Sequence, residues 1–215
     1  MRFDAVVERL ASLPVPLPEG APELIPVLQG MDLASTRPRW PTVDRTLRPA
    51  GVLALIYPDA DGLARVVLTE RATRDGHHSG EVSLPGGKAE AHDADIAATA
   101  LREAAEEVGL DAHAADVRVV GLLDRFVIPV SEFDVTPVVA VASRRPVLVA
   151  SPAEVARIVE PPVATFLPGA PITMVERTIG EWPLRYGTYD VDGLSVWGAT
   201  ARILSQLGAV LGCSS

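Results

Sequence analysis

The chain has little of several things that particular functions require. Of its 215 residues, one is cysteine, four are histidine and 5% are aromatic. The lone cysteine, Cys213, excludes an internal disulfide and is compatible with a reducing compartment. Lysine and arginine number 19 against 28 aspartates and glutamates, so the formal net charge is −9, which argues against nonspecific binding to nucleic acid.

Long apolar runs are also missing. No stretch approaches the roughly 20 continuous apolar residues that cross a bilayer, and residues 1–4 lack the apolar run of a signal peptide. We therefore expect a cytoplasmic protein. The 48% apolar and 22% charged composition is typical of a globular domain, which we place at residues 43–215, after an N-terminal helix and wrapping segment at residues 1–42.

The periodicity of apolar residues predicts an α+β fold, with a mixed β-sheet between α-helices. Helices are expected at residues 3–13 and 196–211, with a weaker one at 153–159. A hairpin is expected from strands at 52–57 and 63–70, which flank an Asp-Ala-Asp-Gly turn. The other expected strands are residues 117–123, 135–141, 163–167, 172–178 and 184–191.

The segment at residues 85–110 is the most informative part of the chain. Asp93 or Asp95 is placed to cap a helix, and Gly109 is placed to end it in the left-handed conformation. Apolar residues then recur at spacings of three and four, which predicts one buried stripe formed by Ala97, Ala100, Leu101, Ala104 and Val108.

Three glutamates lie off this stripe, near the C-terminal end of the expected helix. Glu106 and Glu107 are three and four residues beyond Glu103, so the three carboxylates share one edge. Like charges repel there, and the helix dipole disfavours anions by about 0.3–1 kcal/mol each. Only Arg102 offsets this locally. Mg²⁺ would reverse the sign of these interactions, because it binds carboxylate oxygens and phosphate; the alternative is a solvated, glutamate-rich helix end.

A glycine pair precedes this helix. Gly86 and Gly87 follow Pro85 and an apolar run, and they allow the backbone to turn sharply and approach whatever the helix binds. The loop, the helix and the glutamates therefore form one candidate site.

The pattern G-x6-D-x8-R-E-A-x-E-E-x-G-L, from Gly87 to Leu110, resembles the Nudix box of nucleoside-diphosphate-linked hydrolases. The usual box is one residue shorter, with a glutamate where Asp93 stands here. That insertion is similar to the boxes of the coenzyme A diphosphatase branch. Overall, the resemblance extends from about residue 51 to residue 207.

A signature upstream of the box also resembles that branch, roughly L-L-T-x-R-S-x3-R-x3-G-x3-F-P-G-G. Its leucine, threonine, first arginine, glycine and Pro-Gly-Gly are present as Leu68, Thr69, Arg71, Gly80 and residues 85–87. Three positions depart from it: Ala72 replaces serine, Gly76 replaces arginine and Leu84 replaces phenylalanine. Arg74, two residues before Gly76, could substitute for the missing arginine.

The resemblance implies a Nudix fold and a set of roles. Glu103, Glu106 and Glu107, with the carbonyl of Gly87, would hold Mg²⁺ or Mn²⁺ against a diphosphate. Arg102 either orients these glutamates or contacts substrate. The expected substrate contacts are Arg71, Arg74 and Gly86, although Arg71 is equally well explained by a surface ion pair with an acid such as Glu70.

Several other residues have two interpretations each. Glu154 is either a loop acid near the metal or part of a helix start capped by Ser151. His77 and His78 are a poor zinc pair and are better explained as solvated loop residues. Trp197 either completes the core or stacks on adenine, and the core is favoured.

The resemblance implies hydrolysis of coenzyme A or acyl-coenzyme A to adenosine 3′,5′-bisphosphate and the 4′-phosphopantetheine part. The alternative substrates are ADP-ribose, NADH or another nucleotide. A different class of function is a Nudix module that binds a nucleotide without turnover. A homodimer is expected only from family habit.

Overall fold

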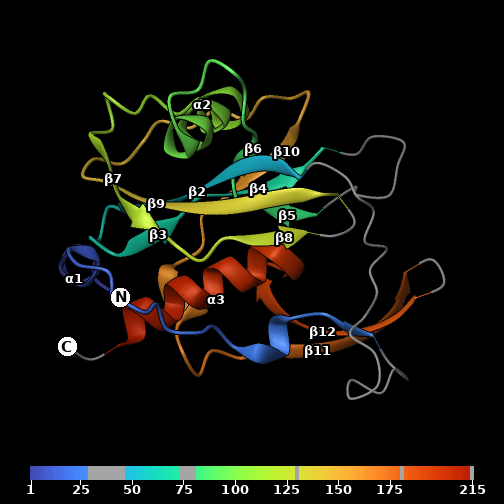
Figure 1. Cartoon of the computed structure of the whole chain (residues 1–215). Coiled ribbons are helices and arrows are strands. Elements are labelled where there is room, and N and C mark those ends of the chain that lie inside the picture. The colour runs from blue at the N-terminus through green and yellow to red at the C-terminus, as the bar shows by residue number, and fades with distance from the viewer. Residues whose placement is uncertain (29–46, 73–80, 129–130, 180–181, 214–215) are drawn as a thin grey trace.

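The computed structural model describes residues 1–28, 47–72, 81–128, 131–179 and 182–213 (Figure 1). Within these ranges the α-helices are α1 (Phe3–Leu10), α2 (Ile96–Val108) and α3 (Gly198–Gly212). Short 3-10 helices are η1 (Pro22–Leu24) and η2 (Val163–Phe166). None of the described helices is long and apolar enough to span a membrane.

A mixed sheet forms the centre of the molecule. Strand β2 (Arg48–Pro58) pairs in parallel with β9 (Phe133–Ala142). The other pairs are antiparallel: β2 with β3 (Ala64–Val66) and β6 (Gly86–Lys88), and β9 with β7 (Val117–Leu122) and β8 (Phe126–Ile128). The parallel pair makes the sheet mixed, as the sequence predicts.

Two smaller antiparallel sheets flank the centre. One has the order β10 (Val155–Val159), β4 (Leu68–Arg71), β5 (Val82–Ser83). In the other, β12 (Trp182–Val191) lies between β1 (Val27–Leu28) and β11 (Thr173–Ile179), and also pairs with β13 (Leu194–Val196). The β11–β12 hairpin lies at the lower right of Figure 1, apart from the central sheet.

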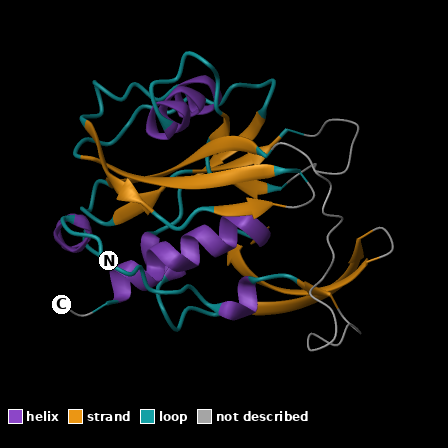
Figure 2. Cartoon of the chain, viewed as in Figure 1, coloured by secondary structure: helices purple, strands orange, loops and turns teal. Residues whose placement is uncertain are grey.

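Helices cover both faces of the central sheet (Figure 2). Alternate residues of β2 point to opposite faces, so Leu53 and Leu55 pack with α2 residues such as Ala104. Ala54 and Ile56 pack in the core that includes α3. This layered arrangement confirms the predicted α+β fold.

The N-terminal helix joins the core on the α3 side. Its residues Phe3, Val6 and Leu10 are buried in the same cluster as Leu204 of α3. The helix ends at Leu10, three residues before the predicted end at residue 13; Leu13 itself precedes Pro14, a position that disfavours the helical conformation.

The predicted hairpin is confirmed, but its second strand is two strands. Ile56 and Val66 are cross-strand partners in β2 and β3, and Gly62 in the turn has φ +72°. At Val67 the chain leaves the central sheet, and β4 enters the smaller sheet beside β10. A periodic pattern alone does not reveal such a change of sheet.

Two predicted elements are wrong. The helix expected at residues 153–159 is instead the end of a turn followed by strand β10 (Val155–Val159), because residues 155–159 pair with β4. The strand expected at residues 163–167 is instead the 3-10 helix η2 (Val163–Phe166). Val163 and Phe166 are both buried, and a 3-10 turn brings residues three apart onto one side.

Candidate active site

Helix α2 forms as the sequence predicts. The Asp95 carboxylate caps its N-terminus by accepting a hydrogen bond from the Ala98 amide at 2.8 Å. Gly109 ends it with φ +65°. The buried stripe holds Ala100, Ala104 and Val108, so the glutamates lie on a different side of the helix.

Strand β6 brings its two glycines against this helix. The Gly86 amide donates a hydrogen bond to Glu107 Oε2 at 3.2 Å. A Cβ atom on Gly87 would lie 2.6 Å from the carboxyl group of Glu103, closer than real contacts allow. Glycine at position 87 therefore lets the Glu103 carboxylate touch the backbone of the loop.

Arg102 is the centre of a charge network. Its guanidinium contacts Glu103 Oε1 at 3.0 Å and Glu106 Oε2 at 3.1 Å. It also donates to both carboxylate oxygens of Asp93, at 3.0 and 3.2 Å, and to the Lys88 carbonyl at 3.1 Å. Arg102 thus contacts Asp93, Glu103 and Glu106 at once, as an orienting role would require.

Asp93 is the anchor of that network. Its side chain is only 5% exposed and also accepts hydrogen bonds from the Thr99 hydroxyl at 2.8 Å and the Glu90 amide at 2.9 Å. The hydrogen bond from Arg102 holds the pKa of Asp93 far below its usual range. The sequence allowed either Asp93 or Asp95 as the helix cap. In the structure Asp95 is the cap, and Asp93 binds Arg102.

The two glutamates nearest the glycines have raised pKa values. Burial raises the pKa of Glu107 to about 7, opposed by the Gly86 amide and the charge of Arg71 and reinforced by the charges of Glu103 and Glu154. Burial likewise raises the pKa of Glu103, opposed by Arg102. A buried negative charge without enough positive charge beside it stabilises a bound cation.

The comparisons with known proteins agree with this geometry. A family model described as NUDIX domain matches residues 47–161, more than half of the chain. The chain belongs to the Nudix family. This membership agrees with the mixed sheet between helices and with the box resemblance at Gly87–Leu110.

Relatives extend the likeness beyond that domain. Nudix hydrolase 22, chloroplastic, of Arabidopsis thaliana is 40% identical over 171 residues, which cover 76% of this chain and 55% of the relative. The uncharacterized Nudix hydrolase NudL of Salmonella newport (strain SL254) is 37% identical over 152 residues, 68% of this chain and 75% of the relative. This chain therefore spans a little over half the length of the Arabidopsis relative.

A solved structure shows a further likeness. The Nudix hydrolase RenU from M. smegmatis has 25% sequence identity and a TM-score of 0.46, over 55% of this chain and 72% of that chain.

Nudix hydrolases generally use divalent metal ions. Within the described ranges, no three acidic, histidine or cysteine side chains already form a complete ligand set, and Arg102 holds Glu103 and Glu106. The donor chemistry nevertheless fits a hard cation, because Glu103 and Glu107 are partly buried anions beside the Gly86–Gly87 backbone.

Arg71 and Glu154 lie close enough to helix α2 for their charges to act on Glu107. Arg71 ends β4, where its charge acts on Glu107, whereas Glu70 pairs with Arg157 at 3.0 Å. Glu70 therefore pairs with Arg157 and not with Arg71, which was the alternative that the sequence allowed. Ser151 begins a turn rather than a helix, so the capping interpretation of Glu154 is wrong.

The turn that carries Glu154 is hydrogen-bonded both to helix α2 and to the residue that follows β4. The Ser151 amide donates to the Glu107 carbonyl at 2.8 Å, and the Ala72 amide donates to the Glu154 carbonyl at 2.9 Å. The charge of Glu154 raises the pKa of both Glu103 and Glu107. The loop-acid interpretation of Glu154 therefore gains support. The pairing of β10 with β4, which the sequence does not reveal, brings Glu154 close to Glu103 and Glu107.

The remaining residues singled out from the sequence are Arg74, His77, His78 and Trp197. Arg74, His77 and His78 lie outside the described residues, as do Gly76 and Gly80. Trp197 is half-buried and stacks on Tyr186 with a centroid distance of 4.8 Å, which agrees with the packing role favoured from the sequence.

Proposed function

We propose that this chain is a metal-dependent Nudix diphosphatase acting on a nucleoside diphosphate-linked small molecule. The observation that carries the proposal is the convergence of Glu103 and Glu107 on the Gly86–Gly87 backbone. In the proposal, Glu103, Glu106, Glu107 and the Gly87 carbonyl hold Mg²⁺ or Mn²⁺. When bound, the ion neutralises the diphosphate and activates water for in-line attack on phosphorus.

The protein groups around this centre have distinct tasks. Arg102, fixed by Asp93, orients Glu103 and Glu106. Arg71 provides positive charge for a phosphate oxygen. The proton of the attacking water needs a carboxylate acceptor, and Glu154 joins Glu103 and Glu107 as the candidates.

Within this reaction, coenzyme A or acyl-coenzyme A is the substrate we favour, because of the inserted box and the upstream signature. One departure from that signature has a structural explanation. Leu84 is 4% exposed and belongs to the core that contains α3, so leucine in place of phenylalanine changes core packing rather than a substrate contact. Thr69, which matches the signature, is buried and bonds to Ser83.

The test is product chromatography after incubation with Mg²⁺ or Mn²⁺ and either coenzyme A or ADP-ribose. We expect adenosine 3′,5′-bisphosphate from coenzyme A. AMP from ADP-ribose alone would retain the chemistry and reject the substrate. An intact pool of both substrates, and of NADH and nucleoside triphosphates, would favour the binding module without turnover.

Three narrower predictions remain predictions: the cytoplasmic location, the homodimer and the boundary between residues 42 and 43. That boundary lies among residues that the structure does not describe. The mass of the protein in solution, from light scattering, tests the homodimer.

A further inference from the structure

Basic residues gather on the α3 side of the central sheet, at the end where β2 begins. Arg48 is the first residue of β2, and Lys88 of β6 lies opposite Ala50, two residues further along β2. Ala50 is buried in the core cluster that contains α3, so Arg48 and Lys88 point to the α3 side of the sheet. Arg202 of α3 approaches the same side. These three exposed residues, Arg48, Lys88 and Arg202, form the basic patch.

Two phenylalanines of the sheet hold the arginines of the basic patch in place. Arg48 Cζ lies 4.2 Å from the ring centroid of Phe133, and Arg202 Cζ lies 4.3 Å from that of Phe126. Phe133 pairs with Ile128, two residues after Phe126 in β8, so the two phenylalanines are diagonal neighbours, roughly 7–8 Å apart. Stacking fixes each guanidinium and leaves its in-plane N–H groups free to donate, so less side-chain entropy is lost when an anion binds.

The positive charge of the basic patch is not neutralised by neighbouring acids. Among the described residues, no member of the patch forms an ion pair with a carboxylate. Arg48 uses one donor on the Ser131 carbonyl, at 2.6 Å. Glu90 lies 3.4 Å from His92, and Asp134 points to the other face of β9. The patch therefore keeps its charge within a chain whose formal net charge is −9.

Strand β6 connects the basic patch to the candidate active site. Lys88 directly follows Gly87, whose carbonyl is a proposed metal ligand. Successive residues of a strand point to opposite faces, so Gly87 meets Glu103 on the α2 side and Lys88 points to the α3 side. Among the described strands β6 pairs only with β2, so its outer edge is open. A substrate with its diphosphate at the metal can therefore place a second anionic group at the patch.

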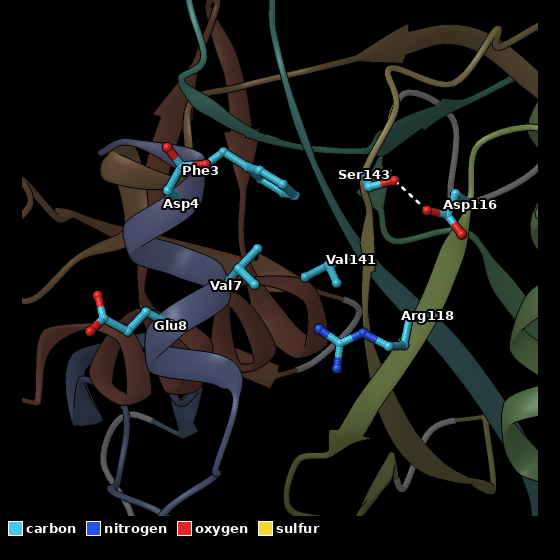
Figure 3. Close-up of a pocket in the computed structure, with 8 residues that line it drawn as sticks. All are labelled: Phe3, Asp4, Val7, Glu8, Asp116, Arg118, Val141 and Ser143. Carbon is cyan, nitrogen blue, oxygen red and sulfur yellow. Dashed lines mark hydrogen bonds between the residues drawn. The ribbon is translucent and has the colours of Figure 1, made fainter.

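The cavity of about 460 Å³ between α1 and the central sheet lacks this combination (Figure 3). Its one basic residue, Arg118 of β7, is accompanied by three acidic residues, Asp4, Glu8 and Asp116. Arg118 pairs with Val141, which is eight residues, or about 26 Å, from Phe133 along β9. Arg118 is thus an exposed arginine on the same face of the sheet but far from the basic patch, which makes it a matched control.

We propose that the basic patch binds a phosphomonoester of the substrate, separate from the diphosphate that is cleaved. The inference rests on the proposed hydrolase function and narrows its substrates to nucleotides that carry such a group, as coenzyme A does at its 3′ position. A phosphomonoester has a charge of about −1.5 to −2 at pH 7 and three acceptor oxygens, which suit two guanidiniums and one ammonium. A nucleobase is less suited, because each phenylalanine ring is already stacked with an arginine.

Steady-state kinetics with Mg²⁺ tests this site by comparing coenzyme A with 3′-dephospho-coenzyme A, which differ only in the 3′-phosphate. We expect kcat/KM to be at least tenfold higher for coenzyme A, mainly through KM, because the patch does not touch the phosphorus under attack. Arg48→Gln, Lys88→Gln and Arg202→Gln should each reduce this ratio at least threefold. The control Arg118→Gln should leave the ratio unchanged.

Calorimetric titration of both compounds in EDTA gives a second readout that does not depend on turnover. The preference for coenzyme A should appear there too, and it should weaken as salt is raised, because exposed charges are screened. Arg202→Lys keeps the charge and loses the planar stack, so its preference should lie between those of the unmodified chain and Arg202→Gln. Lys88 is exposed, so Lys88→Gln keeps the test decisive if an arginine variant fails to fold.

The outcomes separate this site from the hydrolase function. Equal kcat/KM for the two compounds, or a preference that survives all three substitutions, would overturn the phosphomonoester site and retain the hydrolase. Preferential binding of coenzyme A without cleavage of either compound in Mg²⁺ or Mn²⁺ would support the site and refute the hydrolase. Neither binding nor cleavage of either compound would overturn both.

Discussion

Gly87 illustrates how a single missing side chain sets the site. In Gly87→Ala the new methyl group would lie 2.6 Å from the Glu103 carboxyl, so that carboxylate must move. We expect kcat to fall at least tenfold, with a small change in melting temperature, because the end of a side chain moves more easily than backbone. Steady-state kinetics and thermal unfolding measure the two effects.

The control for this substitution is Gly169→Ala. A Cβ there meets no atom within 4 Å, but the backbone has φ +85°, which costs about 1–2 kcal/mol for alanine. The control should lower stability and leave kcat unchanged. Unchanged activity in Gly87→Ala would show that close approach of Glu103 to the loop is unnecessary.

Glu107 makes stability depend on pH when metal is absent. Burial raises its folded pKa to about 7, above the unfolded value near 4.3, so its contribution is full below about pH 4 and is lost as pH rises through about 7. In EDTA, Glu107→Gln should therefore raise the free energy of unfolding, relative to the unmodified protein, more at pH 8 than at pH 4. The difference between the two pH values should be on the order of 1–2 kcal/mol.

Urea unfolding at the two pH values measures this difference. Glu106→Gln is the control, because the Glu106 side chain is 57% exposed and should have little effect. A destabilising effect of Glu107→Gln at pH 8 would contradict the burial of an uncompensated charge.

At the scale of elements, the Asp93–Arg102 contact ties the loop after β6 to helix α2. Asp93→Asn should reduce kcat by at least tenfold because Arg102 then loses the charge that fixes it over Glu103 and Glu106. Since its pKa is lowered in the folded state, Asp93 contributes stability that is full above its unfolded value near 3.9 and is lost as pH falls through the folded value.

Chemical denaturation across pH 2–7 checks the stability difference between the unmodified protein and Asp93→Asn. We expect a constant gap above about pH 5 that narrows at lower pH. The exposed Asp61 supplies the control variant Asp61→Asn, which should show no such gap. If the stability difference between the unmodified protein and Asp93→Asn did not change with pH, the ion pair with Arg102 would not be its cause.

The elements also show where sequence reasoning succeeds. Helix α2, with Asp95, the apolar stripe and Gly109, follows from local signals, and so does the β2–β3 hairpin. Strand β10 and the split between β3 and β4 depend on partners far away in the chain, so no local pattern carries them. The position of Glu154 beside Glu103 and Glu107 depends on the same strand pairing, so the sequence offers the loop acid only as one of two interpretations.

At the scale of the molecule, the N-terminal helix and α3 share one core. Leu10 is 1% exposed, so Leu10→Ala should lower the free energy of unfolding by about 2–5 kcal/mol and retain a single transition. Val15→Ala is the control, because Val15 is 97% exposed. Urea unfolding followed by two probes measures both. A near-zero effect of Leu10→Ala would mean that α1 contributes little to the fold.

In the proposed function, the carboxylates of α2 beside Gly86 and Gly87 drive diphosphate hydrolysis. This role is tested by comparing turnover of coenzyme A by the unmodified chain, Glu107→Gln and the control Glu176→Gln, whose side chain on β11 is 65% exposed, at saturating Mg²⁺ and with circular dichroism to confirm folding. We expect adenosine 3′,5′-bisphosphate from the unmodified chain and the control, and a loss of turnover of at least 100-fold in Glu107→Gln. Equal turnover by all three folded proteins would contradict it.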